Sequence, residues 1–368
     1  MKTIIEQSTK IKATLPIKDP TKKQIVFYNP LMKSNRDISI TLLNSISNKN
    51  IKIALPLAGS GIRGIRFLSE LNKSKIKEIH FNDIKENFKK VLANNLKLNK
   101  IKSSGKIKIS NQEASTFLLN QECFYYIDID PFGSPNPFLA ASVARISRNG
   151  ILAITATDTA ALTGTYLKST KRKYWSTSLK NYLMHEIGLR ILIRKVQLQG
   201  IQFDKALIPI LSYHKDHYFR VYFRSDKGKQ KADEIVRQHQ YFLFCNKCLN
   251  FKTSHYNKET CNCRKHGKQF NFAGPLWVGK LFDKKLVQKM SKNNQFPEEQ
   301  KFLDLLKEES KQDSVGFHDL HQIAKTYKIQ PPQMKDFLKK TKSVRTHFSM
   351  NGFKTDKGIN ELIKSLKK

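Results

Sequence analysis

Between residues 51 and 157, short apolar runs alternate with longer stretches whose apolar residues recur at helical spacing. Short, isoleucine-rich or aromatic runs of this kind are typical of buried strands. The predicted strands cover residues 51–57, 76–82, 106–109, 123–127, 150–157, 206–213 and 217–223. Strands that alternate with helices form a mostly parallel sheet with helices on both faces. The sequence therefore predicts an α/β fold with a doubly wound sheet that ends in a closing pair of strands.

The fourth predicted strand runs into a distinctive stretch at residues 128–137, which combines acids, prolines, a phenylalanine and a glycine. In open α/β sheets, ligands bind at the carboxyl ends of the strands. Asp130 supplies a carboxylate there, and Phe132 supplies a flat face on which a base can stack. Gly133 allows the backbone to approach a ligand closely. This stretch is the candidate substrate site.

These residue types suit the exocyclic amine of a nucleobase, which is a weak nucleophile because its lone pair is delocalised into the ring. The Asp130 carboxylate and the Pro131 carbonyl can accept its two N–H groups. They can also stabilise the positive charge that develops when the nitrogen attacks. Taken alone, the same residues also fit a proline-rich turn in which Asp130 caps a helix.

A glycine-rich turn follows the first predicted strand. Gly59 and Gly61 lie between this strand and a predicted helix, where backbone N–H groups can receive a ligand. Asp83 ends the second strand, at the position where an acid receives ribose hydroxyls in nucleotide-binding folds, and it can also cap the next helix. Glu113 and Ala114 follow the third strand. These positions indicate a nucleotide-like cofactor.

The charge of the chain indicates a polyanionic partner. Its 368 residues include 67 Lys and Arg against 30 Asp and Glu, which gives a net charge of +37. Such an excess is typical of proteins that bind nucleic acid. A strongly basic aromatic segment, Lys168–Trp175, is predicted to be a loop. Since the chain has no apolar run of membrane-spanning length and no signal-peptide apolar region at its start, we expect a cytoplasmic protein.

The strand and helix pattern breaks near residues 224–228, so we predict a domain boundary between residues 225 and 226. The first domain would span residues 1–225 and the second residues 226–368. Towards the end of the chain, three predicted helices precede an extended hairpin, an order typical of a winged-helix module. These elements cover residues 298–309, 319–327, 332–340 and 341–355.

Four of the five cysteines cluster in the second predicted domain. They are Cys245, Cys248, Cys261 and Cys263. Four clustered thiols in an intracellular protein are typical of a structural zinc site. Because the second pair is separated by a single residue, His255 or His266 is an alternative fourth ligand. Cys123 lies alone in an apolar strand, and we expect it in the core.

Several stretches occur in an order that resembles the tRNA guanine-26 N2-dimethyltransferases, particularly their compact archaeal form. They are residues 27–37, 58–63, 82–83, 130–135, 155–160, the cysteine cluster and residues 345–349. The resemblance extends from residue 25 to the C-terminus. It implies a class I methyltransferase domain that uses S-adenosyl-L-methionine and a C-terminal domain that binds tRNA. It implies direct transfer of one and then two methyl groups to guanine 26, by a monomer.

The resemblance also implies roles for individual residues. Asp130 with the Pro131 carbonyl would hold the guanine amine, and Phe132 or Phe27 would stack on the base after it has flipped out of the tRNA. The implied cofactor contacts are Arg36, Arg66, Asp83, Glu113 and Ala114, to which the turn adds Gly59 and Gly61.

The sequence departs from the family at three places, one of which is the closely spaced second cysteine pair, Cys261 and Cys263. Leu55 and Pro56 stand where class I methyltransferases usually carry an acid, and Glu113 stands where the family more often has Asp. Two alternative functions fit parts of the sequence. One is an amine methyltransferase of another base, such as adenine N6. The other is a non-catalytic nucleic-acid-binding zinc protein.

Overall fold

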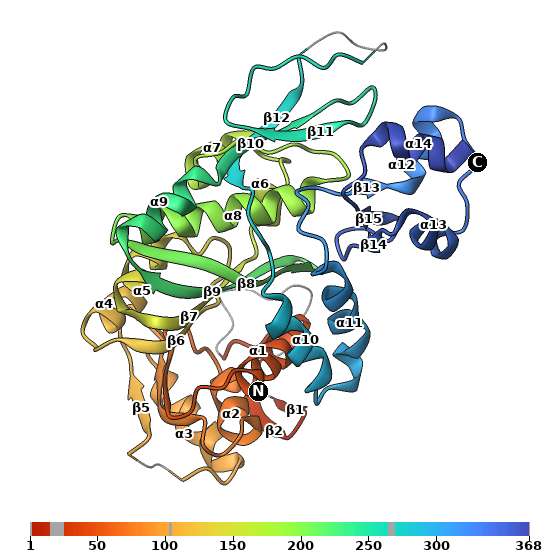
Figure 1. Ribbon diagram of the computed structural model, residues 1–368. Coiled ribbons are helices and arrows are strands. Elements are labelled where there is room, and N and C mark those ends of the chain that lie inside the picture. The colour runs from red at the N-terminus through yellow and green to blue at the C-terminus, as the bar shows by residue number, and fades with distance from the viewer. Residues whose placement is uncertain (1, 15–25, 103–104, 264–268, 368) are drawn as a thin grey trace.

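The protein is built around a seven-stranded sheet with the order β5–β4–β3–β6–β7–β9–β8 (Figure 1). The structure, a computed structural model, describes residues 2–14, 26–102, 105–263 and 269–367. The strands are β3 (Ile51–Leu55), β4 (Ile76–Asn82), β5 (Ile107–Ser110), β6 (Phe124–Ile129), β7 (Ile146–Ala156), β8 (Lys205–Lys215) and β9 (Tyr218–Lys227). The five strands from β5 to β7 are parallel, and β9 runs antiparallel between β7 and β8. The predicted α/β class is confirmed.

The strand order reverses between β3 and β6. From β3 the chain first adds β4 and β5 on one side, and then returns to add β6 on the other side. Helices that leave neighbouring strands in opposite directions leave a crevice at this position, and ligands bind there in open α/β sheets. The glycine-rich turn follows β3 and the Asp130 stretch follows β6, so both predicted motifs lie at the same crevice.

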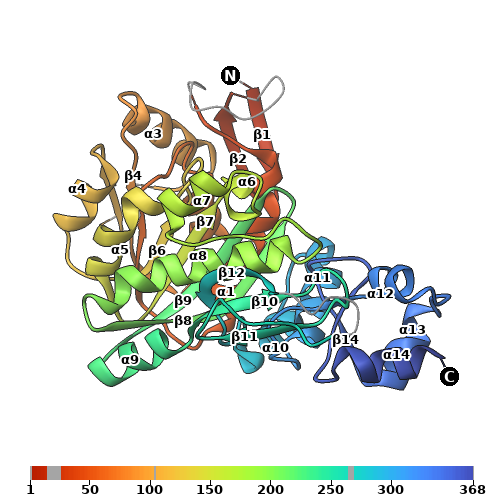
Figure 2. The same ribbon diagram turned by 90° about the horizontal axis from the view of Figure 1, so that it is seen from above.

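Helices cover both faces of the sheet (Figures 1 and 2). One face carries α1 (Lys33–Ser45), α2 (Ile62–Glu70) and α3 (Phe88–Leu98), and the other carries α4 (Ala114–Leu119), α5 (Leu139–Arg145) and α8 (Met184–Ile201). A glycine lets α2 lie close to the sheet, because a Cβ on Gly64 would come within 2.1 Å of Phe81 and 2.6 Å of Leu55. This close packing fixes the start of α2 at the crevice.

An N-terminal hairpin, which the sequence did not predict, joins this first layer of helices. Its strands β1 (Lys2–Glu6) and β2 (Thr9–Ala13) pair antiparallel. The backbone N–H of Lys10 donates to Asn99 Oδ1 and that of Lys12 donates to Asn95 Oδ1, both at 2.8 Å. Both asparagines lie at the end of α3. The hairpin is therefore attached to the methyltransferase-like part of the chain.

The C-terminal part begins with α9 (Lys229–Arg237) and a small sheet with the order β11–β10–β12. Its strands are β10 (His239–Phe244), β11 (Phe251–Ser254) and β12 (Asn271–Trp277). Strand β12 packs against α8, where Arg190 Nη1 donates to the carbonyl of Trp277 at 3.0 Å. The elements that follow are α10 (Lys284–Lys292), α11 (Gln300–Glu309), β13 (His318–Asp319), α12 (Leu320–Tyr327), α13 (Met334–Thr341), β14 (Val344–Arg345), β15 (Gly352–Lys354) and α14 (Ile359–Lys367).

The C-terminal elements spread along the first part of the chain rather than forming a separate unit. Helix α10 packs on α1, and the last module, from β13 to α14, extends to one side (Figure 1). The predicted order of helices and hairpin is present as α11, α12, α13 and the pair β14–β15, with β13 added to make a three-stranded sheet. Among the helices of the described ranges, none combines the length and hydropathy that a membrane span requires.

Two local predictions were wrong. Lys168–Trp175 is not a loop, since most of it forms α7 (Leu167–Tyr174), which follows the short helix α6 (Thr159–Leu162). Cys123 is exposed ahead of β6 and is no core residue.

Candidate active site

A cavity of about 430 Å³ opens at the carboxyl ends of β3, β4 and β6. Its walls combine the glycine-rich turn, the end of β4, the stretch after β6 and the segment that leads into α1. The predicted site residues that line it are Phe27, Arg36, Gly59, Asp83, Asp130, Pro131 and Phe132. Residues that lie far apart in the sequence thus meet in one site.

Four predicted cofactor residues do not line this cavity. Gly61 adopts φ +81° at the start of α2 and donates its N–H to the Ala58 carbonyl. Arg66 is fully buried in α2. Glu113 is exposed and caps α4 through a 2.9 Å bond from the Thr116 N–H, and Ala114 follows it in a buried position. Their cofactor roles remain predictions.

The glycine-rich turn and the second strand are joined by Asp83. The Gly59 N–H donates to Asp83 Oδ2 at 2.7 Å, and the Lys85 N–H donates to Oδ1 at 3.1 Å. Gly59 adopts φ +56°, a conformation that favours glycine. Asp83 does not cap α3, which begins at Phe88 after Asn87. Its carboxylate is therefore fixed in the cavity wall.

Two phenylalanine rings meet across the cavity. The centroids of Phe27 and Phe132 lie 4.4 Å apart with an angle of 67° between the planes. Phe27 precedes α1 and Phe132 follows β6, so the pair connects two loops. Their contact is edge-to-face, and a planar base can stack on the exposed faces of such rings.

Asp130 is the first member of a row of alternating charges. Its Oδ2 forms a short ion pair with Arg63, which lines the cavity although the sequence analysis gave it no role. Arg63 also lies 3.5 Å from Asp128, and Asp128 pairs with Arg220 at 2.7 Å. Tyr126 Oη donates to Asp128 at 2.6 Å.

Burial and charge act in opposite directions in this row. Burial alone would raise the pKa of Asp128, but the guanidinium groups of Arg220 and Arg63 hold it below its ordinary value. The same carboxylates raise the pKa of Arg63 despite its burial. The side chain of Asp130, at the cavity end of the row, is 21% exposed. The row thus presents one accessible carboxylate on a fixed base.

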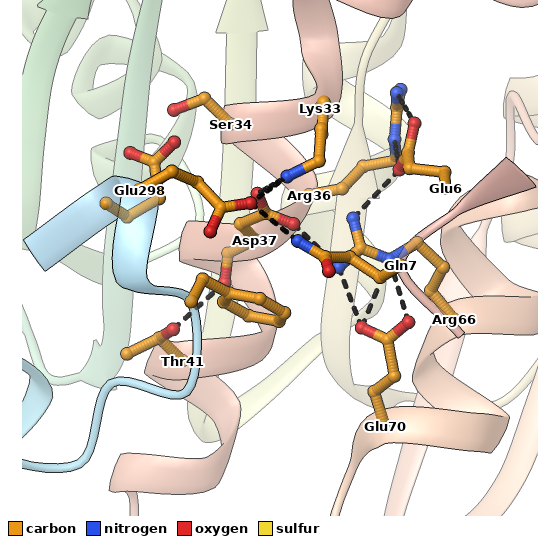
Figure 3. Close-up of polar contacts among 12 residues, drawn as sticks. Glu6, Gln7, Lys33, Ser34, Arg36, Asp37, Thr41, Arg66, Glu70 and Glu298 are labelled. Atoms are coloured by element: carbon orange, nitrogen blue, oxygen red, sulfur yellow. Dashed lines mark hydrogen bonds and ion pairs between the residues drawn. The ribbon is translucent and has the colours of Figure 1, made fainter. Parts of the chain in front are cut away.

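A second buried network holds Arg36 against the cavity wall (Figure 3). Arg36 donates to Glu6 from Nε at 2.7 Å and from Nη2 at 2.5 Å. Arg66 donates to the same carboxylate at 2.8 Å, and it pairs with Asp37 and Glu70. Burial would raise the pKa of Glu6, but Arg36 and Arg66 lower it to about 2. The N-terminal hairpin therefore carries the acid that orients Arg36.

The four clustered cysteines form a candidate metal centre outside the cavity. The sulfur atoms of Cys245, Cys248, Cys261 and Cys263 all lie within 4.8 Å of one another. The Sγ–Sγ distance is 3.9 Å between Cys245 and Cys263 and 3.6 Å between Cys248 and Cys261. A tetrahedral zinc with Zn–S bonds of about 2.3 Å places its sulfur ligands about 3.8 Å apart. The donor set therefore fits zinc.

The alternative zinc ligands are not needed for this geometry. His255 stands outside the cluster, and its Nε2 lies 3.3 Å from Gln240 Nε2. His266 lies outside the described residues.

The chain matches known proteins over nearly its whole length. The family model of N2,N2-dimethylguanosine tRNA methyltransferase matches residues 3–367. A tRNA (guanine(26)-N(2)/guanine(27)-N(2))-dimethyltransferase of Aquifex aeolicus is 40% identical over 357 residues, covering 93% of this chain and 89% of the relative. A tRNA (guanine(26)-N(2))-dimethyltransferase of Methanocaldococcus jannaschii is 38% identical and covers 94% and 93%.

A solved structure supports the same assignment. Trm1 from Pyrococcus horikoshii, in complex with S-adenosyl-L-methionine, superimposes on this chain with a TM-score of 0.88 at 31% identity. The match covers 100% of both chains, and so includes the C-terminal elements as well as the large sheet. On the evidence of its family model, its relatives and its fold, this chain belongs to the N2,N2-dimethylguanosine tRNA methyltransferase family.

Proposed function

We propose that this chain transfers one and then two methyl groups from S-adenosyl-L-methionine to the N2 amine of guanine 26 in tRNA. The observation that carries this proposal is the meeting of Asp130, Pro131 and the Phe27–Phe132 ring pair in one cavity with the Gly59–Asp83 contact. Relatives that share more than a third of the residues are named for this reaction, and one is also named for guanine 27.

The cavity suits a cofactor of this kind. Its volume falls within the range of about 300–1,000 Å³ that is usual for small-molecule sites. We assign Asp83, which accepts from the Gly59 N–H, to the ribose hydroxyls, and Arg36, which lines the cavity, to the methionine carboxylate. When bound, S-adenosyl-L-methionine supplies a methyl group already activated on a sulfonium. The protein then has to orient the reactants and stabilise charge.

The substrate amine is held by the stretch after β6. The Asp130 carboxylate and the Pro131 carbonyl accept its N–H groups while the base stacks on Phe132 or Phe27. The nitrogen lone pair forms the new N–C bond as the S–C bond breaks and its electron pair stays on sulfur. The amine then loses one proton, and we assign the partly exposed Asp130 carboxylate as its acceptor. Repetition gives the dimethylated product.

We further propose that the two parts of the chain have different roles. Residues 1–225 carry out methyl transfer, and residues 226–368 help to bind the tRNA body through phosphates. The cysteine cluster holds one structural zinc that fixes the loops next to β10 and β11. The enzyme acts as a monomer.

The test is a labelled-methyl transfer assay on an unmodified tRNA transcript, run beside the same transcript with adenine in place of guanine 26. We expect label in the first transcript and none in the second, and nuclease digestion should recover the nucleotides of N2-methylguanosine and N2,N2-dimethylguanosine. Equal labelling of both transcripts would move the target to another position. No labelling of either, in protein that binds the cofactor, would overturn the proposed substrate.

A further inference from the structure

Helix α7 presents a basic and aromatic surface to solvent. Thr170 and Tyr174 face inward and are buried. The outward residues, which we call the α7 surface, are Tyr166, Leu167, Lys168, Lys171, Arg172, Lys173 and Trp175. Tyr166 is 64% exposed and Trp175 is 54% exposed. Residues 165–175 contain no acidic residue, so the surface is strongly positive.

The α7 surface is attached directly to the rim of the active site. Tyr174 Oη donates to Asp158 at 2.6 Å, just beyond the end of β7, and it lies 3.3 Å from Ser134 Oγ. Ser134 lines the cavity two residues after Phe132. Asn136 Nδ2 donates to the Lys173 carbonyl at 2.7 Å. A strand of substrate that leaves the cavity over this rim therefore meets α7.

Trp175 is held in place although it is exposed. It ends α7 with φ +53°, and its backbone N–H donates to the Lys171 carbonyl at 3.1 Å. Arg194 donates to the Trp175 carbonyl at 3.2 Å. Lys195 Nζ lies 3.0 Å from the centroid of the indole ring. A cation thus covers one face of the ring and holds the ring in an orientation in which a partner can stack on it.

We propose that the α7 surface binds a single-stranded stretch of tRNA next to the extruded guanine. Lys168, Lys171 and Arg172 contact phosphates, and Trp175 stacks on a base. Cations interleaved with exposed aromatic rings are the means by which proteins hold single strands, since every base has a face on which to stack. The inference rests on the proposed function, because it assigns the strand to the substrate of the same site.

The phosphate contacts are tested by the salt dependence of tRNA binding. The variant Lys168→Ala/Lys171→Ala/Arg172→Ala removes three exposed cations from α7. The matched control, Lys49→Ala/Lys73→Ala/Lys106→Ala, removes three exposed cations shortly before β3, β4 and β5, at the amino ends of these strands and opposite the cavity.

The slope of log affinity against log salt should fall by about 2 in the α7 variant, at about 0.7 per single-strand phosphate contact. It should be unchanged in the control. Equal slopes in wild type and α7 variant would overturn the phosphate contacts.

Trp175 allows a direct test of stacking. The chain has two tryptophans, and Trp277 is only 3% exposed. Adding tRNA should therefore quench mainly the Trp175 fluorescence, and Trp175→Phe should remove the quenching while keeping most of the affinity. Trp175→Ala should raise KM for tRNA about tenfold at unchanged kcat. An unquenched wild type, or an unchanged KM in Trp175→Ala, would overturn the stacking role.

The two binding measurements, fluorescence quenching and salt slope, test this inference separately from the proposed function. Quenching and salt slopes are measured without turnover, so they report the α7 surface even if guanine 26 is not the target. Cofactor binding, measured in each variant, confirms that the fold is intact. A wild type that methylates guanine 26 while its α7 variant binds tRNA equally well would leave the function standing and overturn only the α7 surface.

Discussion

Asp130 forms an ion pair with Arg63 inside the protein itself. Arg63 occupies one carboxylate oxygen, so the ion pair limits how Asp130 can rotate and directs its other oxygen to the cavity. Arg63 is in turn held by Asp128 and by Ser39, whose Oγ accepts from Nη1 at 3.0 Å. Catalytic groups need this kind of fixed geometry, because small displacements reduce the rate strongly.

Replacing Asp130 by alanine should abolish methyl transfer. The variant loses the acceptor that stabilises charge on the amine, and losing one such group costs on the order of 10²–10³-fold in kcat. Cofactor binding should be nearly unchanged, because Asp83 and Gly59 are untouched. Single-turnover transfer and calorimetric cofactor binding measure the two effects.

The variant Asp130→Asn serves as the control, since it keeps the shape and an acceptor oxygen but not the charge. Turnover at the wild-type rate in Asp130→Ala would remove this residue from the mechanism.

The sequence predicted that Asp130, Pro131 and Phe132 lie together at the end of β6, because they are consecutive residues of one motif. It did not predict Arg63 as the partner of Asp130. Arg63 and Arg66 lie one helical turn apart in α2, and the sequence alone does not say which of them faces the cavity. The structure places Arg63 there and Arg66 in the network around Glu6. Arg220, in β9, has no local signal at all.

At the scale of elements, the N-terminal hairpin stabilises the cofactor side of the cavity through Glu6. Because Arg36 and Arg66 lower its pKa from 4.5 to about 2, ionised Glu6 stabilises the fold by about 3 kcal/mol. This contribution is fully present above pH 4.5 and is lost as the pH falls towards 2. Glu6→Gln should lower the free energy of unfolding at pH 7 by about 3–5 kcal/mol, since buried guanidinium groups lose their partner.

Urea unfolding at pH 7 and pH 3 measures the loss, and the gap between wild type and variant should narrow at pH 3. Glu298→Gln is the matched control: its side chain is 45% exposed and pairs with Lys33, so its effect should stay below about 1 kcal/mol. A gap that is constant with pH would show that Glu6 does not titrate as described.

The cysteine cluster predicts about one zinc per chain. Cys248→Ser should lose the metal and destabilise the small sheet, because structural zinc contributes directly to folding. Elemental analysis of protein purified without chelator measures the zinc, and thermal unfolding measures the stability. The exposed Cys123→Ser is the control and should retain the metal. Wild-type protein without zinc would reject the site.

Helices and strands whose apolar residues recur at regular spacing were predicted, and those without such spacing were not. Helix α7 buries only two of its eight residues, so its sequence shows no apolar stripe and reads as a loop. The N-terminal hairpin is short and basic, and its burial comes from contacts with α2 and α3 that the sequence does not show. The cysteine spacing, in contrast, was sufficient to predict the cluster.

At the scale of the whole molecule, the predicted boundary at residue 225 separates segments that are extensively joined. Glu186 in α8 accepts from Lys354 at 2.9 Å, and Lys215 pairs with Glu299 at 2.7 Å. The motif at residues 345–349 is tied to α11, because His347 Nδ1 lies 2.6 Å from Glu309. These contacts connect distant segments, and no local pattern predicts them.

A chain of residues 1–225 should therefore fold poorly. Without β12, the face of α8 that packs against Leu276 and Trp277 becomes exposed to water. We expect binding of a hydrophobic dye and a broad thermal transition, compared with a cooperative transition in the full chain. A monomeric fragment that melts as sharply as the full chain would establish residues 1–225 as an independent domain.

The charged row behind Asp130 has a consequence for repeated catalysis. Two carboxylates and two guanidinium groups sum to zero, so the row that our proposal places beside the reacting amine carries no net charge. Methyl transfer moves one positive charge from sulfur to nitrogen, the proton that Asp130 accepts leaves the amine neutral again, and release of that proton to water restores the charge of the row. The singly methylated base therefore faces the same electrostatic surroundings as the unmodified one. One site can thus perform two successive alkylations, with the added methyl group rather than any altered charge distinguishing the second from the first.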